Sequence, residues 1–196
     1  MVLEPIVETV AESADRADQP GDAELVAAIN QGSHAAFETL YRRHRDWTVN
    51  LAFRFTGDAA LALDVMQETF LYLLRKFPGF ELRASLRTLL YPAVRNLSIA
   101  ARRKASRCQA GSGEEDLLAT LPAPVIAARG SDDLTTVLAG LTEEHREVLL
   151  LRFVDGLSLE EISVAMAIPL GTVKSRLHNA LKRLRENPRT RELFGG

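Results

Sequence analysis

The sequence predicts an all-α protein made of two small helical domains joined by a flexible linker, with a helix-turn-helix in the second domain. Apolar residues recur at steps of three and four over most of the 196 residues, and no segment alternates apolar and polar residues as a strand would. Aromatic residues make up only 6% of the chain, which disfavours a β-sandwich. We expect an acidic disordered tail at 1–21, a helical domain at 22–105, a linker at 106–131, a second helical domain at 132–188 and a tail at 189–196.

Turn and capping residues divide the first domain into helices. A short helix is expected over 22–30, and Ser33 then caps a long helix that ends at Gly57. Asp58 caps the next helix, which ends at Pro78-Gly79. A last helical stretch covers about 84–104, with a kink or break at Pro92 because proline cannot donate to the carbonyl of Thr88. The expected apolar stripes are Phe37, Leu40, Tyr41, Trp47, Leu51 and Phe55 on the long helix, and Leu63, Met66, Phe70, Leu73, Leu74 and Phe77 on the next.

The second domain is expected to hold four short helical pieces between 132 and 186. Ser158 and Glu161 have the spacing of a capping box, and Pro169 suits the start of the following helix. Ala167 occupies the turn, where glycine is common and a left-handed alanine costs about 1 kcal/mol. The last helix places Val173, Leu177, Ala180, Leu181 and Leu184 on its inner face, and Thr172, Ser175, His178, Asn179 and Lys182 on its outer face, with Lys174 and Arg176 on the flanks.

The charge of the chain is distributed unevenly. The net charge of −2 by itself argues against nucleic acid as a partner. However, residues 83–107 hold seven basic residues and no acid, and residues 170–191 hold seven basic residues and one acid. Two such regions would attract a polyanion, although a solvated helix face would have a similar composition.

Composition excludes several classes of protein. No apolar run approaches the ~18 residues of a membrane span, and the first residues lack the basic start and apolar stretch of a signal peptide. One cysteine, Cys108, can form neither an internal disulfide nor a cysteine zinc site, and the four histidines lack a metal-ligand spacing. We therefore expect a cytoplasmic protein with no membrane contact of its own, no metal and no cofactor.

Three segments of the second domain have a specific similarity to a known family. They read EEHREVLLLR at 143–152, GLSLEEI at 156–162 and LGTVKSRLH at 170–178. Together they closely resemble region 4 of bacterial extracytoplasmic-function (ECF) sigma factors. In the first domain, DVMQETF at 64–70 and SLRTLLYPAVRNL at 85–97 resemble region 2 of the same family. The resemblance covers about residues 22–188, with both motif sets in the expected order.

The resemblance implies a protein that directs core RNA polymerase to specific promoters by binding, without catalysis. It implies contacts with the β′ clamp and the β flap of the polymerase, with promoter DNA and with an anti-sigma factor. The residues implied to contact the polymerase clamp are Asp64, Gln67, Glu68, Leu71 and Arg75.

By the same resemblance, the −10 element is contacted by Arg83, Arg87, Tyr91, Arg95, Asn96, Arg102 and Arg103. Tyr91 is equally compatible with a position in the core. At the −35 element we expect Lys174, Ser175, His178 and Asn179 at base edges, and Thr172, Arg176, Lys182 and Arg183 at phosphates. An amphipathic last helix that only packs is the alternative for this segment.

Two other functions were compared with this one. A two-domain helix-turn-helix regulator that is not a polymerase subunit would need a receiver or ligand domain, and the first half shows no such pattern. An enzyme is not expected, because no catalytic triad order, phosphate-binding glycine loop or carboxylate pair is present.

The length of the linker predicts how the domains behave when the protein is free. About 26 flexible residues have a resting span of ~28 Å, whereas two promoter elements one and a half DNA turns apart are separated by ~50 Å. We therefore expect the free protein to be compact or loosely jointed, and the polymerase to hold the domains apart.

Overall fold

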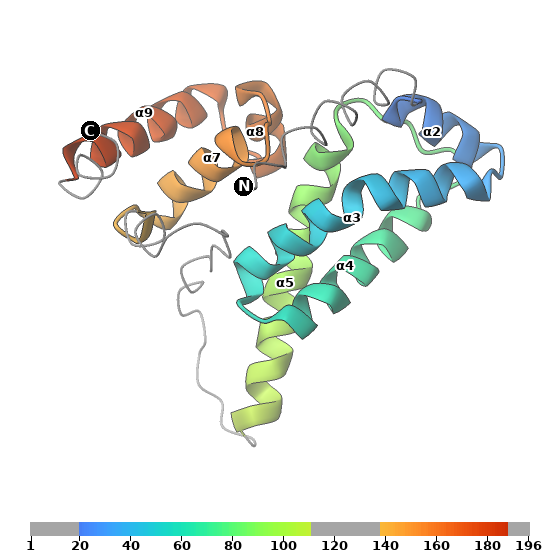
Figure 1. Cartoon of the computed structure of the whole chain (residues 1–196), viewed down its shortest axis with the longest axis horizontal. Helices are drawn as coiled ribbons and strands as arrows, with labels where there is room; N and C mark the ends of the chain where they lie inside the picture. Colours follow the sequence, from blue (N-terminus) through green and yellow to red (C-terminus); the bar gives the residue numbers. More distant parts are fainter. Residues whose placement is uncertain (1–19, 111–137, 188–196) are drawn as a thin grey trace, which may run out of the picture.

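The structure, a computed structural model, describes residues 20–110 and 138–187. Every regular secondary-structure element in these two ranges is an α-helix (Figure 1). The first domain consists of α2 (Asp22–Asn30), α3 (His34–Thr56), α4 (Ala59–Leu74) and α5 (Leu86–Ala110). The second consists of α7 (Glu143–Phe153), α8 (Leu159–Met166) and α9 (Leu170–Glu186). The all-α prediction is confirmed. Most of the predicted N-terminal tail, the whole C-terminal tail, most of the linker and most of the first helical piece after it lie outside the described residues.

The predicted helix boundaries in the first domain follow from local capping chemistry. The Ser33 hydroxyl accepts a hydrogen bond from the backbone N–H of Ala36, and the Asp58 carboxylate accepts one from that of Leu61. Gly57 ends α3 in the left-handed conformation, with φ of 70°. These three predictions are confirmed.

The buried stripe of α4 differs from the predicted one. Ala62, Val65, Met66, Phe70 and Leu73 face the core formed with α3 and α5. Leu63 and Leu74 were predicted to share this face, but they are 48% and 45% exposed. Each lies one position away from the buried register, and at 100° per residue that displacement turns the side chain towards solvent.

Helix α5 continues through Pro92, so the predicted break is absent from this helix. Proline removes one backbone hydrogen bond, but the residues on either side of it are firmly packed. Leu90, Tyr91 and Val94 are each at most 1% exposed, and their burial holds both halves of the helix in place. The helix also extends to Ala110, beyond the predicted start of the linker at 106.

The second domain contains the predicted helix-turn-helix. Ser158 and Glu161 form the capping box at the start of α8, with hydrogen bonds of 3.1 Å and 2.8 Å. Ala167 ends α8 in the left-handed conformation, with φ of 53°. The Ser163 hydroxyl donates to the carbonyl of Ile168 at 2.6 Å and thereby fixes the turn into α9. The predicted position of Ala167 and the capping box are both confirmed.

Replacing Ala167 with glycine is expected to stabilise the protein by about 0.5–1 kcal/mol. The left-handed conformation costs alanine about 1–2 kcal/mol, and the greater unfolded-state freedom of glycine offsets only part of that gain. Urea denaturation of the full chain measures the difference. As a control, Gly156→Ala should destabilise by a similar amount, because Gly156 has φ of 72° and open space around it. A loss of stability in Ala167→Gly would contradict the expectation.

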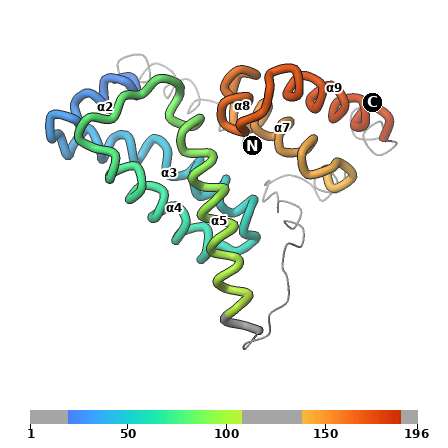
Figure 2. The backbone as a smooth tube through the Cα atoms, turned by 180° about the vertical axis from the view of Figure 1, so that it is seen from behind, coloured from blue at the N-terminus to red at the C-terminus, as the bar shows by residue number. Residues whose placement is uncertain are grey.

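The two domains are in contact with each other. α8 packs against the N-terminal half of α5, and both views show α8 beside that half, α9 running away from it, and the C-terminal end of α5 extending past the other helices (Figures 1 and 2). One apolar cluster is shared between the domains. It contains Leu51, Phe55, Tyr91 and Val94 from the first domain and Val148, Leu151, Leu157 and Ile162 from the second. Of the two arrangements expected for the free protein, the structure has the compact one.

Candidate nucleic-acid and polymerase interfaces

The outer face of α9 carries a dense set of hydrogen-bond donors. Val173 and Ala180 are fully buried on the opposite face, where α9 packs on α7 and α8. The predicted base-edge residues Lys174, Ser175, His178 and Asn179 are all exposed, as are Lys182 and Arg183. Thr172 is half-buried at the start of the helix. This is the geometry of a helix that can enter a DNA major groove with its polar side facing the bases.

Some of these side chains already have partners within the domain. Arg176 forms an ion pair of 2.9 Å with Glu144 on α7, and its side chain is only 20% exposed. The Ser175 hydroxyl donates to the carbonyl of Thr172 at 3.0 Å. Arg176 is thus a predicted phosphate ligand that must exchange an existing partner for DNA.

The exposed side of α4 holds the five residues predicted to bind polymerase. Asp64, Gln67, Glu68, Leu71 and Arg75 are all exposed, and at 100° per residue they lie within one strip of the helix. Leu71 is 45% exposed on this strip, beside charged and amide groups, and is its one large apolar side chain.

The residues predicted to contact the −10 element fall into two groups. Arg83, Asn96 and Arg103 are exposed, and Arg102 is half-buried on the projecting part of α5. Arg87 and Arg95 are instead half-buried at the contact between the domains. A cleft of about 590 Å³ opens at that contact, and Arg95, Asn96, Glu144 and Arg176 lie on its walls.

Tyr91 does not face solvent in this structure. Its ring is 1% exposed, packs edge-to-face on Phe55, and its hydroxyl donates a hydrogen bond to Glu147 of the second domain. In this arrangement Tyr91 therefore occupies a core position, the alternative that the sequence left open, and its contact with the −10 element stays a prediction. Burial against both Phe55 and α7 is the physical reason.

A second polar contact between the domains surrounds Asp155, which lies in the turn between α7 and α8. Trp47 Nε1 donates to its carboxylate at 2.8 Å, and Arg54 Nη2 pairs with the other carboxylate oxygen at 2.5 Å. Arg87 Nη1 donates to the backbone carbonyl of Asp155 at 2.6 Å. We refer to Asp155, Trp47, Arg54 and Arg87 as the Asp155 cluster.

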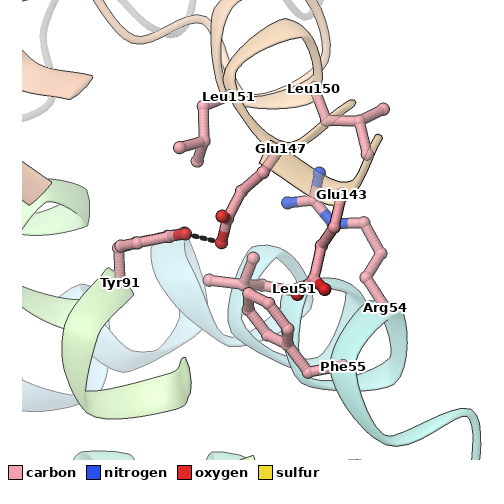
Figure 3. A pocket seen from close by; sticks show the side chains of 8 residues that line it. All are labelled: Leu51, Arg54, Phe55, Tyr91, Glu143, Glu147, Leu150 and Leu151. Carbon is pink, nitrogen blue, oxygen red and sulfur yellow. Dashed lines mark hydrogen bonds between the residues drawn. The ribbon is translucent and has the colours of Figure 1, made fainter. Parts of the chain in front are cut away.

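Glu147 lies near this cluster in an apolar setting. Figure 3 shows its carboxylate directed at Tyr91, with Leu51, Arg54 and Phe55 of α3 on one side and Leu150 and Leu151 of α7 on the other. Arg95 Nε is 3.7 Å from the same carboxylate. Burial raises the pKa of Glu147 to about 7, although Arg54 and Arg176 act in the opposite direction.

Sequence reasoning missed Trp47 as a polar contact and did not single out Arg54, Glu147 or Asp155. Trp47 and Arg54 are seven residues apart on α3 and therefore lie on the same face of the helix. This spacing could have predicted that the two side chains share a binding partner. Asp155, which precedes Gly156, has the pattern of an ordinary turn residue.

Residues 20–110 and 138–187 contain neither a metal-binding cluster nor a membrane-spanning helix. In that part of the chain, no group of three or more histidine, cysteine, aspartate or glutamate side chains is arranged to hold a metal ion. Within the same ranges, no helix has the length and apolarity required to cross a membrane.

Comparison with known proteins identifies both domains. Residues 40–108 match the family model described as Sigma-70 region 2, and residues 137–186 match Sigma-70, region 4. The ECF RNA polymerase sigma factor SigE of Mycolicibacterium smegmatis is 30% identical over 185 residues, covering 91% of this chain and 72% of the relative. The ECF RNA polymerase sigma factor SigL of Mycobacterium tuberculosis is 36% identical over 162 residues, covering 77% and 88%.

Solved structures resemble the fold as a whole. The sigma factor RpoE of Bartonella quintana, in complex with the anti-sigma factor NepR, is 25% identical with a TM-score of 0.56, covering 76% of this chain and 94% of that one. CnrH in complex with the cytosolic domain of CnrY has a TM-score of 0.61 at 22% identity, covering 84% and 95%. The second likeness concerns the fold alone.

Proposed function

Because this chain belongs to the ECF family of RNA polymerase sigma factors, we propose that it directs core RNA polymerase to specific promoters by reading a −10 and a −35 element. The observation that carries the proposal is that relatives named as sigma factors match both domains, while α9 presents a polar outer face suited to a major groove. The chain acts by binding DNA and polymerase, as a transcription initiation factor and not as an enzyme.

Each surface has its own role in this proposal. Lys174, Ser175, His178 and Asn179 on α9 contact base edges of the −35 element, and Thr172, Arg176, Lys182 and Arg183 hold its phosphates. In the first domain Arg83, Arg87, Arg95, Asn96, Arg102 and Arg103 bind the −10 region. The exposed strip of α4 binds the β′ clamp, and Phe153, Val154 and Val164, each over 60% exposed, offer an apolar surface to the β flap.

An anti-sigma factor is the regulatory partner in this proposal. A relative of similar fold, at 25% identity, was solved with an anti-sigma factor bound. The alternative, a helix-turn-helix regulator outside the polymerase, is not favoured because the region 2 match gives the first domain a polymerase-related role.

In vitro transcription tests the proposal. The purified chain is mixed with core polymerase that lacks any sigma factor and with fragmented genomic DNA, and the 5′ ends of the transcripts are mapped. We expect a limited set of start sites that appear only when the chain is present. Transcripts identical to those of core polymerase alone would overturn the proposal.

The polymerase-binding strip gives a separate prediction. Leu71→Ala should weaken binding to core polymerase about tenfold, which corresponds to about 1.4 kcal/mol for an exposed apolar contact at an interface. Leu63→Ala is the matched control, because Leu63 is a similarly exposed leucine on the same helix but outside the predicted contacts. Binding is measured by fluorescence anisotropy of the labelled chain. Equal affinities of the two variants would argue against the assignment of Leu71.

A further inference from the structure

The last residue of α2 holds the loop that connects α4 to α5, residues 75–85. Asn30 Oδ1 accepts hydrogen bonds from the backbone N–H groups of Gly79 and Phe80, at 2.7 Å and 3.2 Å. Asn30 Nδ2 donates to the backbone carbonyl of Phe80 at 2.8 Å. A single amide side chain, which carries both an acceptor and donors, thus binds three backbone groups of a segment that is neither helix nor strand.

Apolar contacts hold the same 75–85 loop against the first domain. The ring of Phe77 packs edge-to-face on that of Phe80, with centroids 5.5 Å apart, and Leu82 packs on the same cluster of buried residues. Such contacts have no preferred direction, so they tolerate a shift of the loop along the surface. The hydrogen bonds of Asn30 depend on direction, and they determine which backbone groups of the loop face α2.

Helix α2 is itself anchored to the domain, so Asn30 is a fixed point for the loop. The buried side chains of α2 are Leu25, Val26 and Ile29. At the other end of the helix, the Asp22 carboxylate pairs with Arg43 at 2.7 Å and with the buried His44 at 2.8 Å, both on α3. The position of the 75–85 loop is therefore set by α3 through α2.

The 75–85 loop carries one of the residues proposed above to bind the −10 region. Arg83 lies three residues after Phe80 and three residues before Leu86, which is fully buried at the start of α5. Its guanidinium is 3.4 Å from the carboxylate of Glu81, and both side chains are more than 70% exposed. An ion pair this exposed contributes little, so the guanidinium can exchange Glu81 for a phosphate.

Loss of the Asn30 hydrogen bonds would move the first backbone anchor before Arg83. The N–H of Phe77 donates to the carbonyl of Leu74 at 3.1 Å, which makes Phe77 the preceding anchor. The segment around Arg83 would then begin three residues earlier than it does with Phe80 held. A longer segment has more conformations, so holding Arg83 at a DNA phosphate would cost more entropy.

We propose that Asn30 is a positioning residue for the −10 element, because its hydrogen bonds fix the 75–85 loop where Arg83 meets a phosphate of the promoter. This inference rests on the proposed function. It assigns a role in DNA binding to α2, a helix that holds none of the residues assigned above to DNA or to polymerase.

Exchange of the Gly79 amide hydrogen tests the contact in the free chain. The full chain is labelled with ¹⁵N-glycine, and exchange in heavy water is followed by NMR. Asn30→Ala should accelerate exchange at Gly79 about tenfold, because the N–H loses its acceptor. Gln31→Ala is the matched control, since it removes an exposed amide at the adjacent position, and it should leave the rate unchanged. Equal rates in wild type and Asn30→Ala would overturn the proposal.

Binding of holoenzyme to promoter DNA tests the effect on function. The probe is a fluorescein-labelled promoter fragment taken from the mapped start sites, with the −10 region left unpaired. Asn30→Ala should bind it about fivefold more weakly than Gln31→Ala, and the slope of log affinity against log salt concentration should become shallower by about 0.7, the contribution of one phosphate contact on a single strand. A general loss of stability would lower the active fraction of holoenzyme and leave this slope unchanged. An unchanged slope therefore refutes a positioning role.

Arg83→Ala identifies the residue through which Asn30 acts. It should reduce the affinity and the salt slope by the same amounts as Asn30→Ala. The double variant should lose little more than either single variant, because both changes remove one contact. Circular dichroism checks that each variant retains its helix content. Losses that multiply in the double variant would show that Asn30 does not act through Arg83, contrary to the proposal.

Failure of the proposed function has a different signature. If wild-type holoenzyme binds the fragment no more tightly than DNA of unrelated sequence, promoter recognition itself is refuted, whatever the rate of exchange at Gly79. If the wild type binds specifically and Asn30→Ala binds as tightly as Gln31→Ala, the role of Asn30 is refuted and the proposed function stands.

Discussion

The contact between the two domains is expected to weaken as the pH rises from about 5 to about 8. Burial raises the pKa of Glu147 to about 7 in the closed protein, whereas an exposed glutamate keeps its ordinary value of 4.5. The closed form therefore binds more protons than the open form. The resulting stabilisation of the closed form is fully present below a pH of about 4.5 and is lost as the pH rises through about 7. The free energy lost over this range totals about 3 kcal/mol.

The surroundings of Glu147 determine how large this effect becomes. Arg54 of α3, Arg95 of α5 and Arg176 of α9 face the carboxylate and favour its ionised form, as a hydrogen bond from the Tyr91 hydroxyl also does. Glu143, one turn earlier on α7, lines the same pocket. Burial exceeds the effect of these charges, which is why the pKa of Glu147 lies above its ordinary value.

The measurement is the compactness of the full chain by small-angle scattering across this pH range, with Glu147→Gln beside the wild type. Glutamine cannot ionise but still accepts a hydrogen bond from Tyr91, so the variant should stay closed at pH 8. Glu160→Gln is the control, because Glu160 is an exposed glutamate on α8. The difference between wild type and Glu147→Gln isolates the contribution of Glu147. A Glu147→Gln variant that opens with pH as the wild type does would contradict the expectation.

Glu147 and Asp155 respond differently to the same interface. Asp155 meets two donors at hydrogen-bond distance, so its charge is compensated when the domains close. Glu147 has one hydrogen bond, and the cations that face it, Arg95 at 3.7 Å among them, do not outweigh its burial, so the closed form favours the protonated carboxyl. Loss of the Asp155 side chain should therefore open the protein, whereas neutralising Glu147 should close it further.

Local chemistry made much of the fold predictable from the sequence. The caps at Ser33, Asp58 and Ser158 and the left-handed ends at Gly57 and Ala167 depend on neighbouring residues, and each prediction was confirmed. The inner face of α9 was predictable as well, because one buried stripe at a helical period determines it.

The contact between the domains was not predictable in the same way. Trp47 and Asp155 are separated by 108 positions, and no local pattern reports a pairing over such a distance. Tyr91 suited a base-stacking role as well as a core role, and only its contacts with Phe55 and Glu147 show that it takes a core position in this arrangement. The error at Leu63 and Leu74 has another cause, since an apolar side chain can be placed on the wrong side of a helix by a shift of one residue.

Replacing Lys174 with alanine is expected to weaken promoter binding by about 1–3 kcal/mol, or roughly 5- to 150-fold, and to relax specificity at one −35 position. Lys174 is exposed at the start of the second turn of α9, next to the fully buried Val173 that fixes the helix on the domain. A lysine held in this way can reach the edge of a guanine in the major groove.

Lys182→Ala separates this role from simple electrostatics. Lys182 lies two turns further along the same outer face, 4.0 Å from Glu186, and is assigned to a phosphate. Its loss should weaken binding to all sequences equally. The slope of log affinity against log salt concentration should become shallower by about the contribution of one phosphate contact. Holoenzyme made with each variant is titrated against a promoter library with every −35 base varied in turn, at two salt concentrations. If Lys174→Ala also weakens binding equally on every sequence, Lys174 contacts only the DNA backbone, and the base-edge role must be assigned to Ser175, His178 or Asn179.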